Sequence, residues 1–127
     1  MTTVREIMSA ELVTVDPSVN LMQAAHLMSV GHVGSVLVLE EGSLVGIFTE
    51  RDILRALAAY PTADSARTSS VSKAMTRDPV TINPDASVGE ALDLMLSRGF
   101  RHLPVMQGDT LVGVVSMRDL AKSLAKE

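Results

Sequence analysis

Two short stretches of the chain combine a hydroxyl side chain with an aspartate three residues later. They are Thr49 to Asp52 and Ser116 to Asp119, and each lies where a β-branched apolar run gives way to a helical pattern. At the start of a helix such a pair satisfies free backbone amides and suits the positive end of the helix dipole. The same geometry attracts an anion, and a carboxylate in the first turn can bind both hydroxyls of a ribose. Helix capping alone and nucleotide binding are therefore two interpretations of one pattern.

An arginine directly precedes each of these aspartates. Arg51 stands before Asp52, and Arg118 stands before Asp119. A guanidinium at this place either neutralises the carboxylate or reaches a phosphate. The apolar strands that flank both stretches would supply walls for a base.

Both stretches belong to a longer internal repeat. Residues 4–57 align with residues 71–124 at a fixed offset of 67, without a gap and with 15 identical positions. Shared composition does not account for a gapless match across several predicted elements, so the sequence indicates a duplication. We expect the following organisation: repeat 1 at residues 3–60, a polar surface linker at residues 61–69 and repeat 2 at residues 70–125.

Each repeat predicts the element order β-α-β-β-α, and therefore an α/β (α+β) fold. The strands are expected at residues 11–17, 35–39 and 43–48 of repeat 1, and at residues 78–84, 103–106 and 110–115 of repeat 2. The first helix of each repeat begins at a capping box and ends near a glycine: Asn20, Gln23 and Gly31, then Ser87, Glu90 and Gly99. In the last helix we expect these apolar side chains to face inward: Ile53, Leu54, Leu57, Leu120, Ala121 and Leu124.

Composition excludes several classes of function. The 127 residues include no cysteine, so disulfides, thiolate metal sites and cysteine nucleophiles are ruled out. The net charge of −4 and an aromatic content of 2% argue against a nucleic-acid partner. No apolar run is long enough to cross a membrane and no secretory signal pattern begins the chain, so we expect a cytoplasmic protein. The three histidines lack metal-ligand spacing, no nucleophile–base set is present, and we therefore expect no metal, no cofactor and no enzyme activity.

The sequence resembles a known family in its doubled element order and in three segments. These segments are "VGSVLVLEEGSLVGIFTERDIL", "RHLPV" and "LVGVVSMRDL". The sequence resembles a tandem pair of cystathionine-β-synthase-type (CBS) domains, a Bateman module, over Thr3–Leu57 and Ser70–Leu124. The resemblance implies two repeats packed about a pseudo-two-fold axis. It also implies two clefts between them that commonly bind AMP, ADP, ATP, S-adenosylmethionine or NAD.

In the family each cleft takes residues from both repeats. By resemblance, one cleft would be lined by Thr49, Arg51, Asp52, Asp78, Pro79, Val80, Arg101 and His102. The other would be lined by Ser116, Arg118, Asp119, Glu11, Leu12, Val13, Gly34 and Ser35. The aspartates would bind ribose, the hydroxyl residues would contact ribose or phosphate, and the backbone around Val13 and Val80 would frame the adenine.

The two copies differ at the positions expected to meet a phosphate. Arg101 and His102 of repeat 2 align with Gly34 and Ser35 of repeat 1. Only the cleft that contains Asp52 would therefore carry positive charge from this strand start. We expect it to be the better nucleotide site.

The leading hypothesis is a regulatory module that binds an adenosine nucleotide and signals to a separate effector protein through its conformation or dimer geometry. Wide apolar helix stripes favour a homodimer. One alternative is a purely structural interaction protein whose hydroxyl–aspartate pairs are only caps. A metal or nucleic-acid sensor is a further alternative, for which the composition gives little support.

Overall fold

The computed structural model describes residues 1–126 of the chain, which form a mixed α/β fold. The chain divides into two compact units. Unit 1 consists of Met1–Leu12 and the chain from Val80 onward, and unit 2 consists of Val13–Pro79. Among residues 1–126, no helix combines the length and the apolar character that crossing a bilayer requires.

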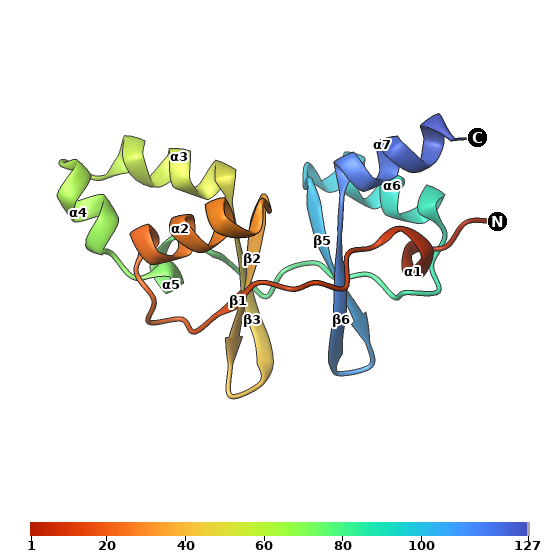
Figure 1. The fold of residues 1–127 in the computed structure, drawn as a ribbon, viewed down its shortest axis with the longest axis horizontal. Coiled ribbons are helices and arrows are strands. Elements are labelled where there is room, and N and C mark those ends of the chain that lie inside the picture. Colours follow the sequence, from red (N-terminus) through yellow and green to blue (C-terminus); the bar gives the residue numbers. More distant parts are fainter. Residues whose placement is uncertain (127) are drawn as a thin grey trace. The chain divides into compact units, whose positions relative to one another are not determined.

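Unit 2 contains a four-stranded sheet in the order β1-β2-β3-β4 (Figure 1). Its elements in chain order are β1 (Thr14–Val15), α2 (Leu21–Gly31), β2 (Ser35–Glu40), β3 (Ser43–Thr49), α3 (Glu50–Ala59), α4 (Ala63–Thr68), α5 (Val71–Ala74) and β4 (Thr76–Arg77). β1 runs parallel to β2, and β2 and β3 form an antiparallel hairpin. Glu41 and Gly42 at its tip have φ values of 51° and 82°, which match the twist of the flanking strands.

The core of unit 2 is formed where α2 and α3 meet the β2–β3 hairpin. It contains these buried side chains: Val15, Leu21, Ala24, Met28, Val36, Val38, Phe48, Ala56, Val71 and Met75. The predicted capping box of α2 is confirmed, since Gln23 N–H donates to Asn20 Oδ1 at 2.8 Å and Asn20 N–H donates to Gln23 Oε1 at 3.0 Å. The helix ends at Gly31, as expected, and His32 follows it in the left-handed conformation, with φ 54°.

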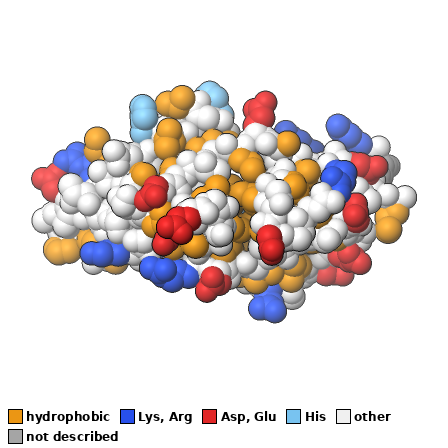
Figure 2. Space-filling model, turned by 90° about the horizontal axis from the view of Figure 1, so that it is seen from below, with side chains coloured by type: hydrophobic (Ala, Val, Ile, Leu, Met, Phe, Trp, Pro, Cys, Tyr) orange, Lys and Arg blue, Asp and Glu red, His pale blue; other side chains and the backbone are white. Residues whose placement is uncertain are grey.

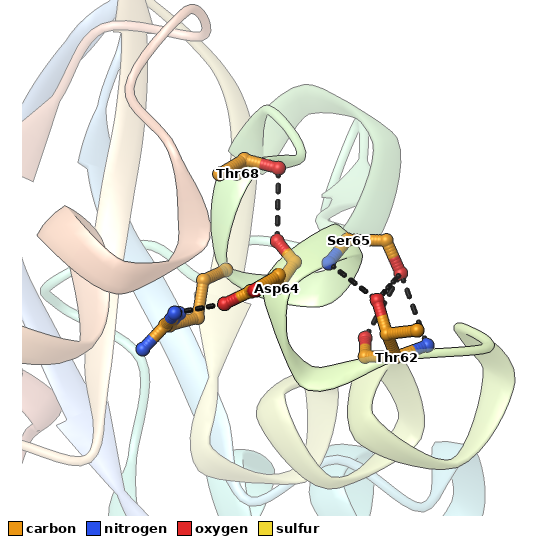
Figure 3. Close-up of polar contacts among 5 residues, drawn as sticks. Thr62, Asp64, Ser65 and Thr68 are labelled. Atoms are coloured by element: carbon orange, nitrogen blue, oxygen red, sulfur yellow. Dashed lines mark hydrogen bonds and ion pairs between the residues drawn. The ribbon is translucent and has the colours of Figure 1, made fainter.

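The predicted linker contains the helix α4. Thr62 caps it: the Ser65 N–H donates to the Thr62 hydroxyl oxygen at 3.0 Å (Figure 3). The hydroxyl of Thr68 donates to the carbonyl of Asp64 at 2.9 Å, and Arg67 forms an ion pair with Asp64. Ala66 is buried, so this segment belongs to the packed body of unit 2.

Unit 1 repeats the hairpin and the two long helices. Its elements in chain order are α1 (Val4–Ile7), α6 (Val88–Arg98), β5 (His102–Gln107), β6 (Thr110–Ser116) and α7 (Met117–Ala125). The predicted cap of α6 is confirmed, since Glu90 N–H donates to Ser87 Oγ at 3.1 Å, and Gly99 ends the helix with φ 74°. The core contains these buried side chains: Val4, Ile82, Val88, Ala91, Met95, Leu103, Val105, Val115 and Leu120.

The two repeats exchange the segments that begin them. The first residues of the chain pack into unit 1, where Ser9 forms a two-way backbone pair with Val114 at 2.9 and 3.0 Å. The start of repeat 2 packs into unit 2, where Val71 N–H donates to Val19 O at 2.7 Å and β4 pairs with β3. Each unit therefore depends on a segment that the sequence assigns to the other repeat.

The strands predicted at residues 11–17 and 78–84 are mostly absent. Only Thr14–Val15 of the first is a strand, and Ile82 of the second makes one isolated parallel bridge to Val105. Two features interrupt the second segment: Asp78 has φ 45°, and Pro79 lacks a backbone N–H to pair.

The last helix of each repeat faces inward less than predicted. Leu120 is fully buried and Ile53 is half-buried, in agreement with the prediction. The remaining side chains are exposed instead: Leu54, Leu57, Ala121 and Leu124. One side of a helix suffices to cover the core, so the wider stripe leaves apolar side chains at the surface.

Candidate functional site

In unit 2 the candidate residues meet where β3 ends at Thr49 and α3 begins. Thr49 keeps an extended backbone, with φ −124° and ψ 170°, and Asp52 occupies the third position of the helix. Asp52 Oδ2 accepts hydrogen bonds from the Thr49 backbone N–H at 2.8 Å and from the Thr49 hydroxyl at 3.2 Å. The Asp52 side chain is buried, with 4% of the residue exposed. A charged group is therefore fixed at a helix start, where the dipole stabilises it.

The equivalent junction in unit 1 has a different hydrogen-bond pattern. Asp119 Oδ2 accepts from the Ser116 backbone N–H at 2.8 Å, and the Asp119 N–H donates to Ser116 Oγ at 3.1 Å. This is a reciprocal capping box. Asp119 is half-buried, in contrast to Asp52.

Each carboxylate uses only one of its two oxygens for the cap. Asp52 Oδ1 lies 3.8 Å from Arg55 Nη1, and Arg55 is itself largely exposed. Asp119 likewise uses Oδ2 for its bond with the Ser116 N–H. A carboxylate oxygen can accept two hydrogen bonds, so both sites keep acceptor capacity for the hydroxyls of a ligand.

Two further candidates lie beside Thr49 in unit 2. Ser35 is the direct cross-strand partner of Thr49 in the β2–β3 ladder, and it is buried. The carbonyl of Gly34 accepts from the N–H of Glu50, the first residue of α3, at 3.2 Å. The start of β2 and the start of α3 are thus joined by backbone contacts.

Arg101 and His102 occupy the corresponding place in unit 1. His102 is the cross-strand partner of Ser116, and the Arg101 carbonyl accepts from Met117 N–H at 2.8 Å. Arg101 is exposed and His102 is half-buried. Within this unit, two potential phosphate ligands therefore stand next to Ser116, which is itself hydrogen-bonded to Asp119.

Four further predicted residues lie where the chain passes between the units. Leu12 ends the first part of unit 1 and Val13 begins unit 2, while Pro79 ends unit 2 and Val80 returns to unit 1. The backbone around Val13 and Val80 is the part expected to frame the adenine. Asp78 directly precedes the second crossing; it is exposed, and its N–H donates to Val45 O at 3.1 Å.

Each predicted cleft draws on both units. Of the first cleft, unit 2 holds Thr49, Arg51, Asp52, Asp78 and Pro79, and unit 1 holds Val80, Arg101 and His102. Of the second, unit 1 holds Ser116, Arg118, Asp119, Glu11 and Leu12, and unit 2 holds Val13, Gly34 and Ser35. The structure joins Thr49 to Asp52 and Ser116 to Asp119. The grouping of the other residues into two clefts stays a prediction.

A pocket of about 340 Å³ adjoins Asp52 and contains residues that sequence reasoning missed. It is lined by Asp52, Arg55, Ala56, Ala59, Tyr60, Lys73 and Ala74. The spacing of three residues between Asp52 and Arg55 was a signal for their pairing. No sequence signal placed Lys73 near Asp52, because Lys73 lies in the segment that repeat 2 contributes to unit 2.

Charges elsewhere on the surface are mixed in sign. On the face drawn in Figure 2, acidic and basic side chains are interspersed with hydrophobic ones. Among residues 1–126, no three His, Asp or Glu side chains are grouped as metal ligands.

Comparisons with known proteins agree on the type of domain. The family model described as CBS domain matches residues 4–59 and 71–126. An uncharacterized 17.7 kDa protein of Acidianus ambivalens is 41% identical over 97% of this chain and 73% of its own. The crystal structure of the CBS-domain-containing protein ATU1752 from Agrobacterium tumefaciens has a TM-score of 0.90 and 31% identity, covering 97% of this chain and 99% of that one.

A further structure was solved with ligands. It is the CBS domain pair of protein MJ0100 in complex with 5′-methylthioadenosine and S-adenosyl-L-methionine. It has a TM-score of 0.89 and 26% identity, covering 99% of this chain and 98% of that one.

Proposed function

Because the chain belongs to the CBS-domain family and carries two copies of the domain, we propose that it is a regulatory module that binds an adenosine-containing small molecule. We expect AMP, ADP or ATP as the ligand, with S-adenosylmethionine and NAD as further candidates. The ligand would occupy the two clefts predicted between the repeats. No catalytic role is proposed for any residue.

The observation that carries this proposal is the state of the two aspartates. Asp52 and Asp119 are each fixed through Oδ2 at the first turn of a helix, which leaves Oδ1 outside the bond to the N-cap residue. A rigid acceptor of this kind suits the paired hydroxyls of a ribose, since its orientation is set before the ligand binds. The pattern occurs at equivalent positions of both repeats.

The ligands of a relative support the choice of an adenosine compound. Both ligands named for the MJ0100 domain pair contain adenine and a ribose ring. Those groups would be recognised here by the aspartates and by the backbone around Val13 and Val80. Arg51, Arg118 and the pair Arg101 and His102 supply positive groups for a phosphate.

The regulatory part of the proposal follows from thermodynamic linkage. A ligand that prefers one arrangement of the two units stabilises that arrangement by its differential affinity. The output would be a change in conformation or in homodimer geometry that a separate effector protein detects. We propose that this takes place in the cytoplasm.

A thermal-shift panel tests the proposal. The protein is heated with AMP, ADP, ATP, S-adenosylmethionine or NAD, each at millimolar concentration, with adenine-free CMP as the control nucleotide. A ligand that binds only the folded state raises Tm. At a concentration of 100 times its Kd it adds about 2.7 kcal/mol to the free energy of unfolding. We expect at least one adenosine compound to raise Tm while CMP does not. No shift with any of them would reject the proposal.

The cap geometry itself favours one second candidate. The hydrogen bonds at Asp52 Oδ2 and Asp119 Oδ2 are those of helix caps, and caps alone require this pattern. A structural interaction module with empty clefts would show the same bonds. The two candidates differ in the panel, because this module would respond to none of the compounds.

A further inference from the structure

The pocket beside Asp52 is formed by two short stretches of unit 2. Five lining residues belong to α3 or its C-terminal cap, at positions 52, 55, 56, 59 and 60, and two belong to α5, at positions 73 and 74. The spacing of three and four residues places the five on one face of α3. The pocket is thus a hollow between one helix face and the segment exchanged from repeat 2.

Small side chains create the hollow. Ala56, Ala59 and Ala74 line it together with Tyr60. The Tyr60 hydroxyl is hydrogen-bonded to Ser69 Oγ at 2.6 Å, which holds the ring next to the residue that precedes the exchanged segment. The volume of about 340 Å³ suits a small organic molecule.

The pocket carries an excess of positive charge. Arg55 and Lys73 contribute two cations and Asp52 contributes one carboxylate. Lys73 is exposed and forms no ion pair with any residue of the described chain, 1–126. The single carboxylate of Asp52 offsets only one of these two positive charges. The pocket therefore favours an anion.

The equivalent positions in unit 1 lack this combination. At the offset of 67, Arg55 corresponds to Lys122 and Ala59 to Lys126, while Lys73 corresponds to Glu6 and Ala74 to Ile7. The α1 segment thus has an acidic residue where α5 has Lys73, and a larger side chain where α5 has Ala74. The duplicated fold does not itself require a cationic hollow, which makes the α3–α5 pocket a feature of its own residues.

We propose that this pocket binds a small organic anion, with its carboxylate or phosphate held by Arg55 and Lys73 and its apolar part against the alanines and Tyr60. Of the residues predicted for the nucleotide clefts, only Asp52 also lines this pocket. Its ligand needs neither adenine nor ribose. An anion there competes with Asp52 for the Arg55 guanidinium, which lies 3.8 Å from Asp52 Oδ1.

Amide-resolved NMR titration with two probes tests the site. Butyrate has a carboxylate on a short alkyl chain, and propyl phosphate has a phosphate on a similar alkyl chain. We expect saturable shifts at the amides of residues 55–60 and 73–74, and the probe that binds more tightly identifies the anion class. Inorganic phosphate, which lacks the apolar body, should bind at least threefold more weakly than propyl phosphate.

Two variants and one matched control decide the outcome. Lys73→Glu copies the residue of the other repeat and should abolish binding, and Arg55→Gln should weaken it at least fivefold. Lys122→Gln removes the cation equivalent to Arg55 on α7 and should change the affinity less than twofold. Shifts that do not saturate, or an equal loss in Lys122→Gln, would overturn the proposal. The probes contain no nucleoside, so this result is independent of the nucleotide proposal.

Discussion

Thr49 and Asp52 are joined through a single carboxylate oxygen: Asp52 Oδ2 accepts both the Thr49 N–H at 2.8 Å and the Thr49 hydroxyl at 3.2 Å. At the equivalent junction the hydroxyl has the opposite role, since Ser116 Oγ accepts the Asp119 N–H at 3.1 Å. One threonine therefore donates to a buried charge, whereas one serine satisfies a backbone amide. Both junctions are capping boxes, and they differ in the hydrogen bond that the hydroxyl makes.

This difference predicts unequal costs for removing the two hydroxyls. Thr49→Val takes a donor away from a buried carboxylate, and hydrogen bonds to charged groups contribute about 1.5–3 kcal/mol. Ser116→Ala removes an N-cap acceptor beside a half-buried group, which costs about 1 kcal/mol. We expect urea unfolding to show the larger loss of stability for Thr49→Val. The hydroxyl-retaining variant Thr49→Ser is the control, and a larger loss for Ser116→Ala would contradict the assignment.

The exchange of segments between the repeats can be tested at Gly113. A Cβ at this position would lie 2.9 Å from the backbone oxygen of Ser9 and 2.6 Å from Met8 Sδ. The Ser9 backbone is held by its pair with Val114, so it cannot move away without loss. We expect Gly113→Ala to destabilise the protein by about 1–3 kcal/mol in urea unfolding.

Gly89 provides the matched control for that substitution. A Cβ there has only Ser87 Oγ within 4 Å, at 3.7 Å, and the residue lies in the helix α6. Gly89→Ala should therefore be neutral or stabilise the protein by up to about 1 kcal/mol. If Gly113→Ala were as harmless as Gly89→Ala, the first residues of the chain would not pack against β6 as described.

Much of the fold could be predicted from the sequence because its signals are local. The capping boxes at Asn20 and Ser87 and the two hairpins depend on residues a few positions apart, and the structure confirms them. The exchange of Val4 and Val71 between units could not be predicted. Both are fully buried apolar residues in equivalent segments, so the pattern says that each is inside but not which core it enters.

The site was predictable to the same extent. The hydroxyl–aspartate spacing fixed the carboxylates at the helix starts, and the structure confirms that geometry. Whether the Thr49 hydroxyl donates or accepts depends on the burial of Asp52, and the sequence pattern carries no information about that burial. The pocket residue Lys73 comes from a distant segment, so its position beside Asp52 appears only in the folded chain.

The exposed leucines of α3 predict a homodimer formed through unit 2. Leu54 and Leu57 are 69% and 54% exposed, and the neighbouring helix α2 adds Met22, Leu27 and Val30, whereas α6 and α7 expose one leucine each. Covering such a face would drive association. We expect the wild-type protein to sediment as a dimer and the double variant Leu54→Gln, Leu57→Gln to sediment as a monomer. Leu96→Gln on α6 is the control; a wild-type monomer at high micromolar concentration would contradict the prediction.

The central claim is that an adenosine nucleotide binds through the aspartates, and that the Asp52 cleft is the stronger site. Isothermal titration calorimetry of the wild type, Asp52→Asn and Asp119→Asn with the compound that raises Tm most tests it directly. Loss of a charged acceptor worth about 1.5–3 kcal/mol corresponds to a roughly tenfold to hundredfold weaker Kd. The account predicts that Asp52→Asn weakens the Kd of the tighter site by this factor. It predicts that Asp119→Asn changes the Kd of the same site less than threefold. Unchanged binding in both folded variants would contradict it.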